Sequence, residues 1–346
     1  MIPAKAYAAY DPQSPLRPYD LERRDPRPND VVIDIAFCGI CHSDLHFVHN
    51  DLDNSEYPLV PGHEIAGTVA RVGSAVTRFK AGDRVGVGCM VNSCRQCEAC
   101  KRGEEQYCSQ FVGTYGATDV DGTRTQGGYA TSVTVDDHFV VRIPDSIPLD
   151  QAAPLLCAGI TTFSPLRTWQ AGPGKRVAVI GLGGLGHMGV KLAAAMGAEV
   201  TVVSTSDRKK ADALRMGATD FLVSTDPAAM AAAANRFDLI INTVSATHEL
   251  NRHLGLLATD GTMVMLGLTT EAMPVSAIPM IMGRRRLAGS LIGGIAETQA
   301  MLDFCAEHGI ASDIEVISAS QINDAYERLM KSDVRYRFVI DTATIA

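Results

Sequence analysis

The sequence predicts an α/β protein of two domains, one irregular, β-rich and mainly antiparallel, the other built on a doubly wound parallel sheet. Three observations carry this prediction. The 346 residues exceed the size at which one hydrophobic core usually divides. The first 150 residues are rich in turns, whereas strand and helix patterns alternate regularly from Lys175 onward. Between the two regions, Gly172-Pro173-Gly174 is typical of a linker-like turn.

The first region reads as short strands separated by turns. Residues 31–36 (VVIDIA) run apolar or alternate, and residues 66–72 continue in the same way. Glycines fall where turns and bulges would interrupt the strands, at Gly67, Gly73, Gly82, Gly86 and Gly88. We therefore expect an irregular region with mainly antiparallel pairing.

The second region alternates strands and helices. The predicted strands are 177–180, 199–203, 221–223, 239–242 and 262–266, and the predicted helices between them are 185–196, 208–216, 228–234 and 250–257. This alternation predicts a parallel sheet with right-handed crossovers. A helix at 297–308 and a strand at 336–341 follow, and local pattern alone assigns them to neither domain.

The start of the parallel region predicts a dinucleotide site. The apolar run 177–180 is typical of a buried parallel strand, and Gly181, Gly183 and Gly186 follow it at G-x-G-x-x-G spacing. Such glycines permit a tight turn, close backbone approach to a pyrophosphate and close helix packing, and the next helix directs N–H groups at that pyrophosphate. The motif predicts a Rossmann domain whose cofactor contacts come from Gly181, Leu182, Gly183, Gly184, Leu185 and Gly186.

The end of the second predicted strand favours a phosphorylated dinucleotide. In NAD sites an acid about 20 residues past the glycines binds the ribose 2′-hydroxyl, but Ser204 occupies that place. A 2′-phosphate instead requires hydroxyl and basic groups. The chain offers Ser204, Thr205, Ser206 and either Lys209 or Arg208. We therefore expect NADP(H), while two alternatives for Asp207 stay open: it is a displaced NAD-type acid, or it caps the next helix.

The composition disfavours several classes of function. Hydrophobic residues make up 46% and charged residues 20%, as in soluble globular proteins, and no apolar run is long enough to span a bilayer. A net charge of −8 argues against nucleic-acid or anionic-membrane partners. The segment Met1-Ile2-Pro3-Ala4-Lys5 has no secretory signal pattern, so we expect a cytoplasmic protein.

Six of the nine cysteines lie between Cys41 and Cys108, and metal binding is the leading explanation for such clustering in a reducing compartment. Four of them follow the spacing of a tetrahedral all-thiolate site, at Cys94, Cys97, Cys100 and Cys108. Zinc fits better than an iron–sulfur cluster, although the spacing excludes neither the cluster nor free or disulfide-linked thiols. A site with four protein ligands has no open position, so its role would be structural.

A catalytic metal needs an open position, and Cys41, His63 and Cys157 form a suitable two-cysteine, one-histidine set. Conspicuous segments surround them: Cys38–Asp44 (CGICHSD), Pro61–Gly67 (PGHEIAG), Ala152–Gly159 (AAPLLCAG) and Asp333–Asp341 (DVRYRFVID). With the four-cysteine loop and the glycine turn, these segments resemble the zinc-dependent medium-chain alcohol dehydrogenases. The resemblance covers nearly the whole chain and favours the cinnamyl-alcohol-dehydrogenase-like branch of NADP-dependent aldehyde reductases.

The resemblance implies a GroES-like catalytic domain, 1–153 completed by 292–346, and an NADP-binding Rossmann domain, 154–291. It implies two Zn²⁺ per chain, one catalytic and one structural, with the reaction in the cleft between the domains. It also implies a homodimer through the cofactor domains. The apolar segments 263–268 and 277–282 suit either that interface or the core.

The resemblance assigns roles around the catalytic metal. Cys41, His63 and Cys157 match its ligands, and Glu64 matches a carboxylate behind the metal that can approach or transiently ligate it. Asp44 matches the acid that orients the ligand histidine. Ser43 matches the hydroxyl that passes the alcohol proton outward through a cofactor ribose to His46, with His42 and His49 as alternatives. Cys38 reads as a packed thiol, and Cys89 and Cys305 as core or surface thiols.

These features predict hydride transfer between NADP(H) and a small aldehyde or primary alcohol, with zinc as the Lewis acid. Aldehyde reduction is the expected direction, and medium-sized aromatic or aliphatic compounds the expected substrates. A quinone or enone reductase without catalytic zinc is disfavoured by the three metal ligands. A polyol dehydrogenase and a non-catalytic NADP-binding redox sensor remain as alternatives.

Overall fold

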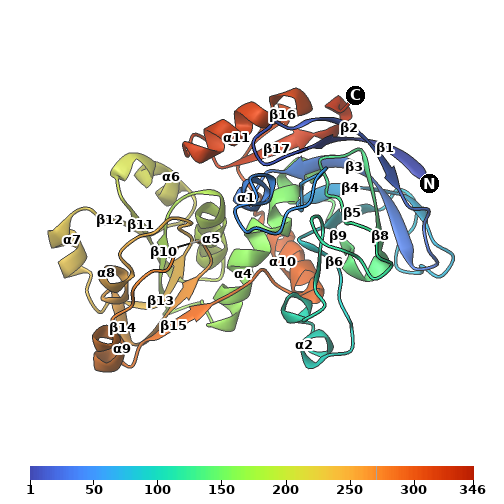
Figure 1. The fold of residues 1–346 in the computed structure, drawn as a ribbon. Coiled ribbons are helices and arrows are strands. Elements are labelled where there is room, and N and C mark those ends of the chain that lie inside the picture. The colour runs from blue at the N-terminus through green and yellow to red at the C-terminus, as the bar shows by residue number, and fades with distance from the viewer. Residues whose placement is uncertain (270) are drawn as a thin grey trace. The chain divides into compact units, whose positions relative to one another are not determined.

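The computed structural model describes residues 1–269 and 271–346, which form two compact units (Figure 1). Unit 1 comprises Met1–Ile160 and Gly293–Ala346, and unit 2 comprises Thr161–Ile292. The first limit falls inside helix α4 (Ala158–Thr168), a few residues after the limit that the sequence suggested at residue 153. The second lies next to residue 291.

Unit 1 is built on a seven-stranded sheet of order β16-β17-β3-β4-β5-β9, with β8 also paired to β3. The strands of unit 1, including the separate pairs β1–β2 and β6–β7, are β1 (Ile2–Ala8), β2 (Arg17–Arg23), β3 (Asp30–Gly39), β4 (Ile65–Val72), β5 (Arg84–Val87), β6 (Met90–Asn92), β7 (Val112–Gly113), β8 (Ser132–Asp136), β9 (Val141–Arg142), β16 (Ile314–Ser318) and β17 (Arg337–Asp341). Its helices are α1 (His42–Val48), α2 (Glu98–Lys101), α3 (Leu149–Ala152), α10 (Ile295–His308) and α11 (Ile322–Met330). The strands of the first 150 residues pair antiparallel, which confirms the predicted character of this region.

The end of the chain completes the sheet of unit 1. Residues 339–341 of β17 pair antiparallel with 37–39 of β3, and β16 extends the sheet as a parallel neighbour of β17. The interior residues of β17, Phe338, Val339 and Ile340, are buried. Strand β17 is therefore an interior strand with buried side chains and a hydrogen-bonded neighbour on each side. Its local sequence pattern did not indicate which strands these neighbours are.

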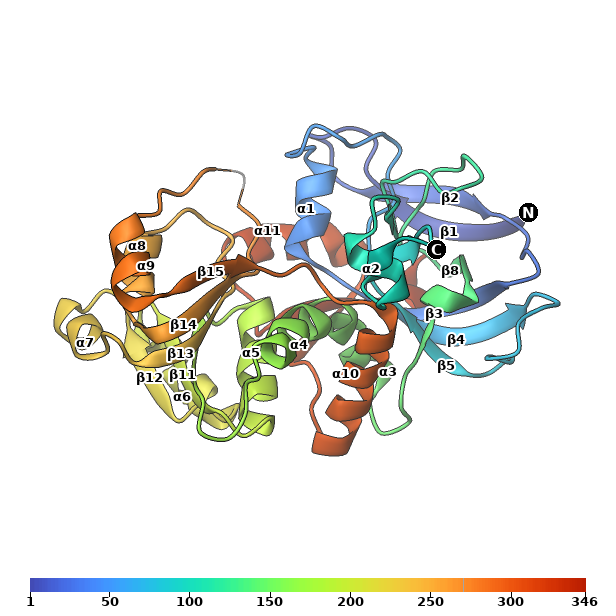
Figure 2. The same cartoon turned by 90° about the horizontal axis from the view of Figure 1, so that it is seen from below.

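Unit 2 is a six-stranded sheet, parallel throughout, of order β12-β11-β10-β13-β14-β15. The strands are β10 (Arg176–Ile180), β11 (Glu199–Ser204), β12 (Asp220–Val223), β13 (Phe237–Asn242), β14 (Leu257–Met265) and β15 (Arg286–Gly289). The helices that follow α4 are α5 (Gly184–Ala195), α6 (Lys210–Arg215), α7 (Pro227–Ala232), α8 (Leu250–Leu254) and α9 (Ala277–Gly283). Helices α5 and α6 cover one face and α8 and α9 the other (Figures 1 and 2), which confirms the doubly wound prediction.

Two predicted helices differ from the structure. The helix predicted at 250–257 ends at Leu254, and Leu257 already belongs to β14. Gly255 terminates α8, and the buried residues after it suit a strand as well as a helix. The helix predicted at 208–216 begins as a 3₁₀ turn, Asp207–Lys209, before α6. Within the described residues, no helix is both long and apolar enough to cross a membrane.

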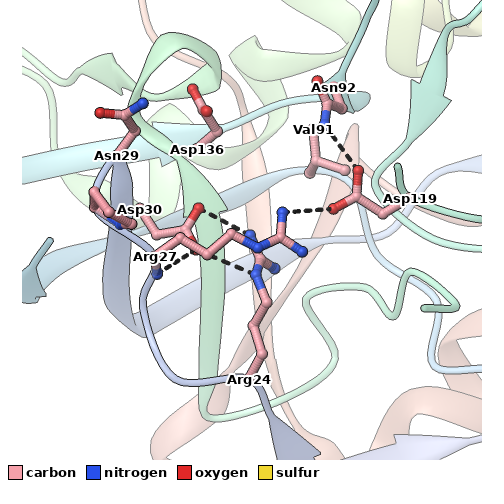
Figure 3. A pocket seen from close by; sticks show the side chains of 9 residues that line it. Arg24, Arg27, Asn29, Asp30, Val91, Asn92, Asp119 and Asp136 are labelled. Carbon is pink, nitrogen blue, oxygen red and sulfur yellow. Dashed lines mark hydrogen bonds and ion pairs between the residues drawn. The ribbon is translucent and has the colours of Figure 1, made fainter. Parts of the chain in front are cut away.

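A polar cavity of about 210 Å³ lies in unit 1 (Figure 3). Arg24 Nη2 lies 2.9 Å from Asp30 Oδ1 in its wall, and Arg27 Nη1 lies 3.8 Å from Asp119 Oδ2. A third acid of the wall, Asp136, is paired with an arginine outside it at 2.7 Å. The charges that line the cavity are thus balanced within the protein, and the predicted site residues do not line it.

Candidate active site

Four predicted ligands converge in unit 1. One ligand atom from each of Cys41, His63, Glu64 and Cys157 lies within 4.8 Å of all the others. Cys41 precedes α1, the pair His63–Glu64 precedes β4, and Cys157 precedes α4, so three separate segments of the chain build the cluster. The two sulfur atoms are 3.9 Å apart.

Two buried atoms of this cluster have no hydrogen-bond partner among the described residues, His63 Nε2 and Glu64 Oε2. Leaving a buried polar atom unpaired costs about 1–3 kcal/mol, so such atoms call for an explanation. A divalent cation held by the two thiolates and the imidazole would engage Nε2, and the nearby carboxylate could approach the cation through Oε2. Two cysteines and one histidine suit a tetrahedral zinc with one open position, and the residues therefore fit the predicted metal.

The surroundings of Cys41 favour its thiolate form even without a metal. The hydrogen bond from Cys157 holds the pKa of Cys41 well below its ordinary value, with further help from His63 and Arg337, although burial opposes the shift. The same hydrogen bond raises the pKa of Cys157. One thiol thus stabilises the ionised form of the other, and the thiolate is the form that binds metal.

Asp44 orients the imidazole of His63. Its Oδ1 atom lies 3.3 Å from His63 Nδ1 and accepts the Gly62 N–H at 3.1 Å, and its Oδ2 atom accepts the Cys41 N–H at 2.8 Å. The side chain is fully buried in the first turn of α1, where an acid can accept the backbone N–H groups left free at a helix start. Because Nδ1 faces Asp44, Nε2 remains for the metal.

Arg337 holds Glu64, a contact that the local sequence did not reveal. Its Nη2 donates to Glu64 Oε1, and both side chains are buried. Burial raises the pKa of Glu64, and the guanidinium opposes that shift. A Cβ atom at Gly39 would lie 1.9 Å from Glu64 Oε2, so glycine at that position makes room for the carboxylate. The indication that the sequence offered was an arginine directly before the apolar residues 338–340, where a buried strand would leave its charge in need of a partner.

The predicted proton relay lies on α1. Ser43 Oγ is 3.7 Å from Cys41 Sγ, and His46 follows three residues later, a spacing that places both on one side of the helix. His46 is half-buried and its Nδ1 lies 2.8 Å from Asp51 Oδ2, whereas His49 is exposed. Asp51 was missed by the sequence analysis, although an acid five residues after a candidate relay histidine is a usable signal.

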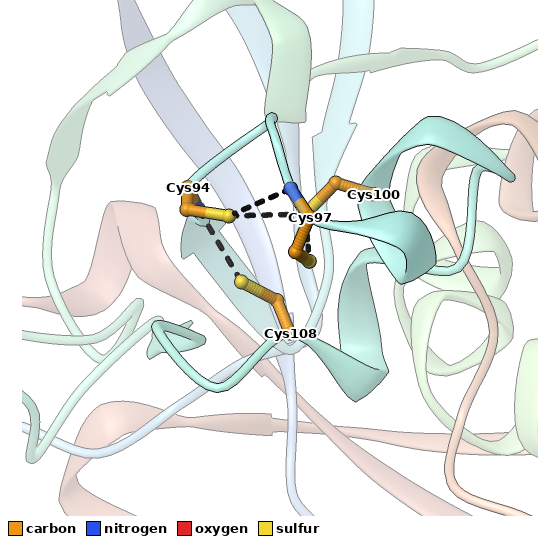
Figure 4. Close-up of side chains that lie close together, drawn as sticks. All are labelled: Cys94, Cys97, Cys100 and Cys108. Atoms are coloured by element: carbon orange, nitrogen blue, oxygen red, sulfur yellow. Dashed lines mark hydrogen bonds between the residues drawn. The ribbon is translucent and has the colours of Figure 1, made fainter.

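The other four predicted ligands also come together (Figure 4). Cys100 Sγ lies 3.5 Å from Cys97 Sγ and 3.9 Å from Cys94 Sγ. Backbone N–H groups point at the sulfurs: those of Gln96 and Cys97 donate to Cys94 and lower its pKa to about 6. The N–H groups of Cys94 and Gln110 donate to Cys108. All four are free thiols here, which suits a closed metal site and excludes disulfides between them in this structure.

The glycine turn of unit 2 shows the three properties that dinucleotide binding requires. Gly181 has φ +87°, which only glycine adopts readily. A Cβ at Gly186 would lie 2.0 Å from the Gly181 carbonyl oxygen, so α5 packs closely on the turn. A Cβ at Gly183 meets no described atom within 4 Å, so this backbone is open to a ligand. The turn follows β10, which is paired with β11 on one side and with β13 on the other. The order of strands reverses between β10 and β13, and parallel sheets of this kind bind ligands at the carboxyl ends of the strands where the order reverses.

The residues predicted to bind the 2′-phosphate lie beside this turn. The Gly181 N–H donates to the Val203 carbonyl, so Ser204, the last residue of β11, is next to the glycines. Lys209 Nζ donates to the Leu182 carbonyl at 2.8 Å. Ser206, and not Asp207, is the N-cap of the 3₁₀ turn, so the capping alternative for Asp207 is wrong. Thr205 is exposed in the same connection.

Comparisons with known proteins agree with this geometry. Residues 27–145 match the alcohol dehydrogenase GroES-like domain, and residues 184–307 match the zinc-binding dehydrogenase domain. The chain is 58% identical over 347 residues to "NADP-dependent alcohol dehydrogenase C 1" of Mycolicibacterium smegmatis, covering 100% of this chain and 99% of the relative.

Two solved structures are similar along their whole length. A cinnamyl alcohol dehydrogenase from Sorghum bicolor has a TM-score of 0.97 at 50% identity, with 99% of each chain covered. A cinnamyl alcohol dehydrogenase from Helicobacter pylori, complexed with NADP(H), has a TM-score of 0.93 at 41% identity, with 100% of this chain and 99% of that chain covered. The chain belongs to the zinc-binding alcohol dehydrogenases.

Proposed function

We propose that the protein interconverts aldehydes and primary alcohols with NADP(H), mainly as a reductase of medium-sized aromatic or aliphatic aldehydes. The observation that carries the proposal is the cluster of Cys41, His63, Glu64 and Cys157, with its two unpaired buried atoms. The names of the relatives, two of which state NADP or NADP(H), support the cofactor. Unit 1 is then the catalytic domain and unit 2 the cofactor domain.

In this proposal each group of residues has one task. Zinc, when bound, supplies a Lewis acid for the substrate oxygen, and NADPH supplies the hydride. Cys41, His63 and Cys157 would hold the metal, and Arg337 holds Glu64 within the same cluster. A second zinc held by the four-cysteine cluster stiffens its loop.

The cofactor is bound by unit 2. The backbone from Gly181 to Gly186 accommodates the pyrophosphate, because Gly183 leaves its approach open. Ser204, Ser206 and Lys209 bind the 2′-phosphate, with the ammonium group supplying the charge. Lys209 already lies against the glycine turn, so one side chain can serve both the turn and the phosphate.

The relay of Ser43, His46 and Asp51 moves the proton. Replacing Ser43 with alanine is expected to lower kcat about 100-fold, the lower end of what a positioned proton donor contributes, with unchanged zinc content. Steady-state kinetics and metal analysis check this. Ser55→Ala is the matched control, because its hydroxyl donates to the Phe47 carbonyl of the same helix and is outside the relay. Full turnover in the Ser43→Ala enzyme would remove the relay from the mechanism.

One set of measurements tests the proposed function. We expect two zinc ions per chain, one for each ligand cluster, and oxidation of NADPH by benzaldehyde or cinnamaldehyde. A kcat/KM for NADH equal to or above that for NADPH would overturn the cofactor assignment. A preference for sugar alcohols over these aldehydes would identify a polyol dehydrogenase. Absence of both metal and turnover would identify a redox sensor.

We also propose that the protein is cytoplasmic, because a reducing environment keeps metal-binding thiols free.

We propose further that the protein forms a homodimer through unit 2. Met263 and Val264 are fully buried and belong to the core, whereas α9 exposes Ile278, Ile281 and Met282 by 70%, 75% and 81%. The neighbouring β15 is an edge strand. Exposed apolar groups beside an open edge favour pairing with a second copy. Ile281→Glu is expected to sediment as a monomer; an unchanged dimer would place the interface elsewhere.

A further inference from the structure

Two buried tyrosines extend the hydrogen bonding of the metal cluster into the interior of unit 1. The Tyr129 hydroxyl donates to Asp44 Oδ2 at 3.1 Å, and the Tyr326 hydroxyl donates to the Tyr129 hydroxyl at 3.3 Å. Tyr129 is fully buried and Tyr326 is 5% exposed. The chain of contacts thus runs from Tyr326 through Tyr129 and Asp44 to the imidazole of His63.

Three distant segments supply these groups. Asp44 lies on α1, Tyr129 lies in the segment before β8, and Tyr326 lies on the buried face of α11 with Ile322, Ala325 and Leu329. Tyr129 is 85 residues from Asp44, and Tyr326 is 197 residues from Tyr129. The C-terminal helix therefore reaches the metal cluster through side-chain hydroxyls as well as through packing.

The four acceptor positions of the Asp44 carboxylate are all used. Oδ1 faces the Gly62 N–H and His63 Nδ1, and Oδ2 faces the Cys41 N–H and the Tyr129 hydroxyl. A carboxylate offers about four lone-pair sites, so the three other donors set its orientation toward the imidazole. Two of these donors are backbone groups beside or within the ligand residues, which leaves Tyr129 as the side-chain donor.

We propose that Tyr129 and Tyr326 are positioning residues for the metal site: their hydroxyls hold the Asp44 carboxylate in the plane that directs His63 Nε2 at zinc. The inference rests on the proposed zinc binding at Cys41, His63 and Cys157. Phenylalanine would fill nearly the same volume at either position. At 129 it would remove the donor to Asp44, and at 326 it would remove only the outermost donor of the chain, so packing and positioning can be separated.

The test follows metal release and the metal spectrum. Tyr129→Phe is expected to release the metal of this site to a chelator about 10-fold faster, the lower end of the effect of removing an outer hydrogen-bond partner. With cobalt exchanged into this site and zinc kept in the four-cysteine site, its absorption bands are expected to shift. Tyr326→Phe leaves the bond from Tyr129 to Asp44 in place and is expected to show smaller changes in the same direction.

Tyr57→Phe is the matched control. The Tyr57 hydroxyl donates to the Val48 carbonyl of α1 at 2.7 Å, so the variant loses a tyrosine hydrogen bond to the helix that carries Asp44 but leaves the chain of donors intact. Its metal release and cobalt spectrum should equal those of the unmodified protein. Urea unfolding of all variants reports any general loss of stability.

The outcomes separate the two proposals. Unchanged metal release and unchanged cobalt bands in Tyr129→Phe would overturn the positioning role, even if the variant were less stable. If Tyr129→Phe does not fold, unchanged release and bands in Tyr326→Phe would overturn the role instead. Failure of the unmodified protein to bind metal at this site would contradict the proposed function itself.

Discussion

Replacing Cys157 with alanine is expected to lower kcat for aldehyde reduction about 1,000-fold, since a Lewis acid contributes several kcal/mol to such a reaction. The variant keeps Cys41, His63 and Glu64 but loses one thiolate from the cluster and the hydrogen bond that lowers the pKa of Cys41. Zinc content should fall from two to one per chain, and NADPH binding should persist because the glycine turn belongs to unit 2. Metal analysis, NADPH fluorescence titration and steady-state kinetics check these results.

Cys38→Ala is the control for this experiment. Cys38 is fully buried three residues before Cys41 but is not part of either ligand cluster. Its pKa is raised by burial, so it is a packed neutral thiol, as the sequence suggested. The control should keep both zinc ions and its turnover. Full activity in Cys157→Ala with one zinc per chain would show that this cluster does not perform the chemistry.

Replacing Arg337 with methionine is expected to lower the free energy of unfolding by about 3–5 kcal/mol, the cost of leaving one partner of a buried ion pair. Glu64 would lose the guanidinium that donates to its Oε1 and would remain fully buried. Urea unfolding of the protein measures the loss. Because burial already raises the pKa of Glu64, the carboxyl group can protonate when Arg337 is removed.

The pH dependence of this loss has a definite sign. A carboxyl group whose folded pKa is raised destabilises the fold progressively as pH rises from the unfolded pKa to the folded pKa. The pKa of Glu64 is raised to about 8 even with Arg337 in place, so both proteins lose stability alike below that pH, and removing the guanidinium raises the pKa further. The loss in Arg337→Met should therefore be larger near pH 9 than near pH 7. Arg328→Met is the control: Arg328 pairs with Glu315 at 2.8 Å but is 40% exposed, so about 1 kcal/mol or less is expected. Equal losses in the two variants would contradict a buried ion pair.

Local motifs were sufficient to predict the two ligand clusters and the glycine turn because their residues are close in sequence or match a known order. The four cysteines lie within one loop, and the three glycines lie within one turn, so neighbouring residues determine their arrangement. The alternation of strands and helices determined the parallel sheet for a similar reason, since each crossover depends on adjacent elements. At residues 256–257 the apolar sequence is compatible with either a helix or a strand, so the predicted helix extended too far.

The sequence by itself thus determined the fold class, the two ligand clusters and the dinucleotide turn, whereas only the tertiary structure decided what holds them in place. Arg337 reaches Glu64 across 273 residues, and Tyr326 reaches Tyr129 across 197. These contacts depend on β17 joining β3 and on α11 burying one face in unit 1. The physical reason is that a buried charge or hydroxyl needs a partner, but its chemistry does not specify which distant segment supplies one; strand order and packing make that choice.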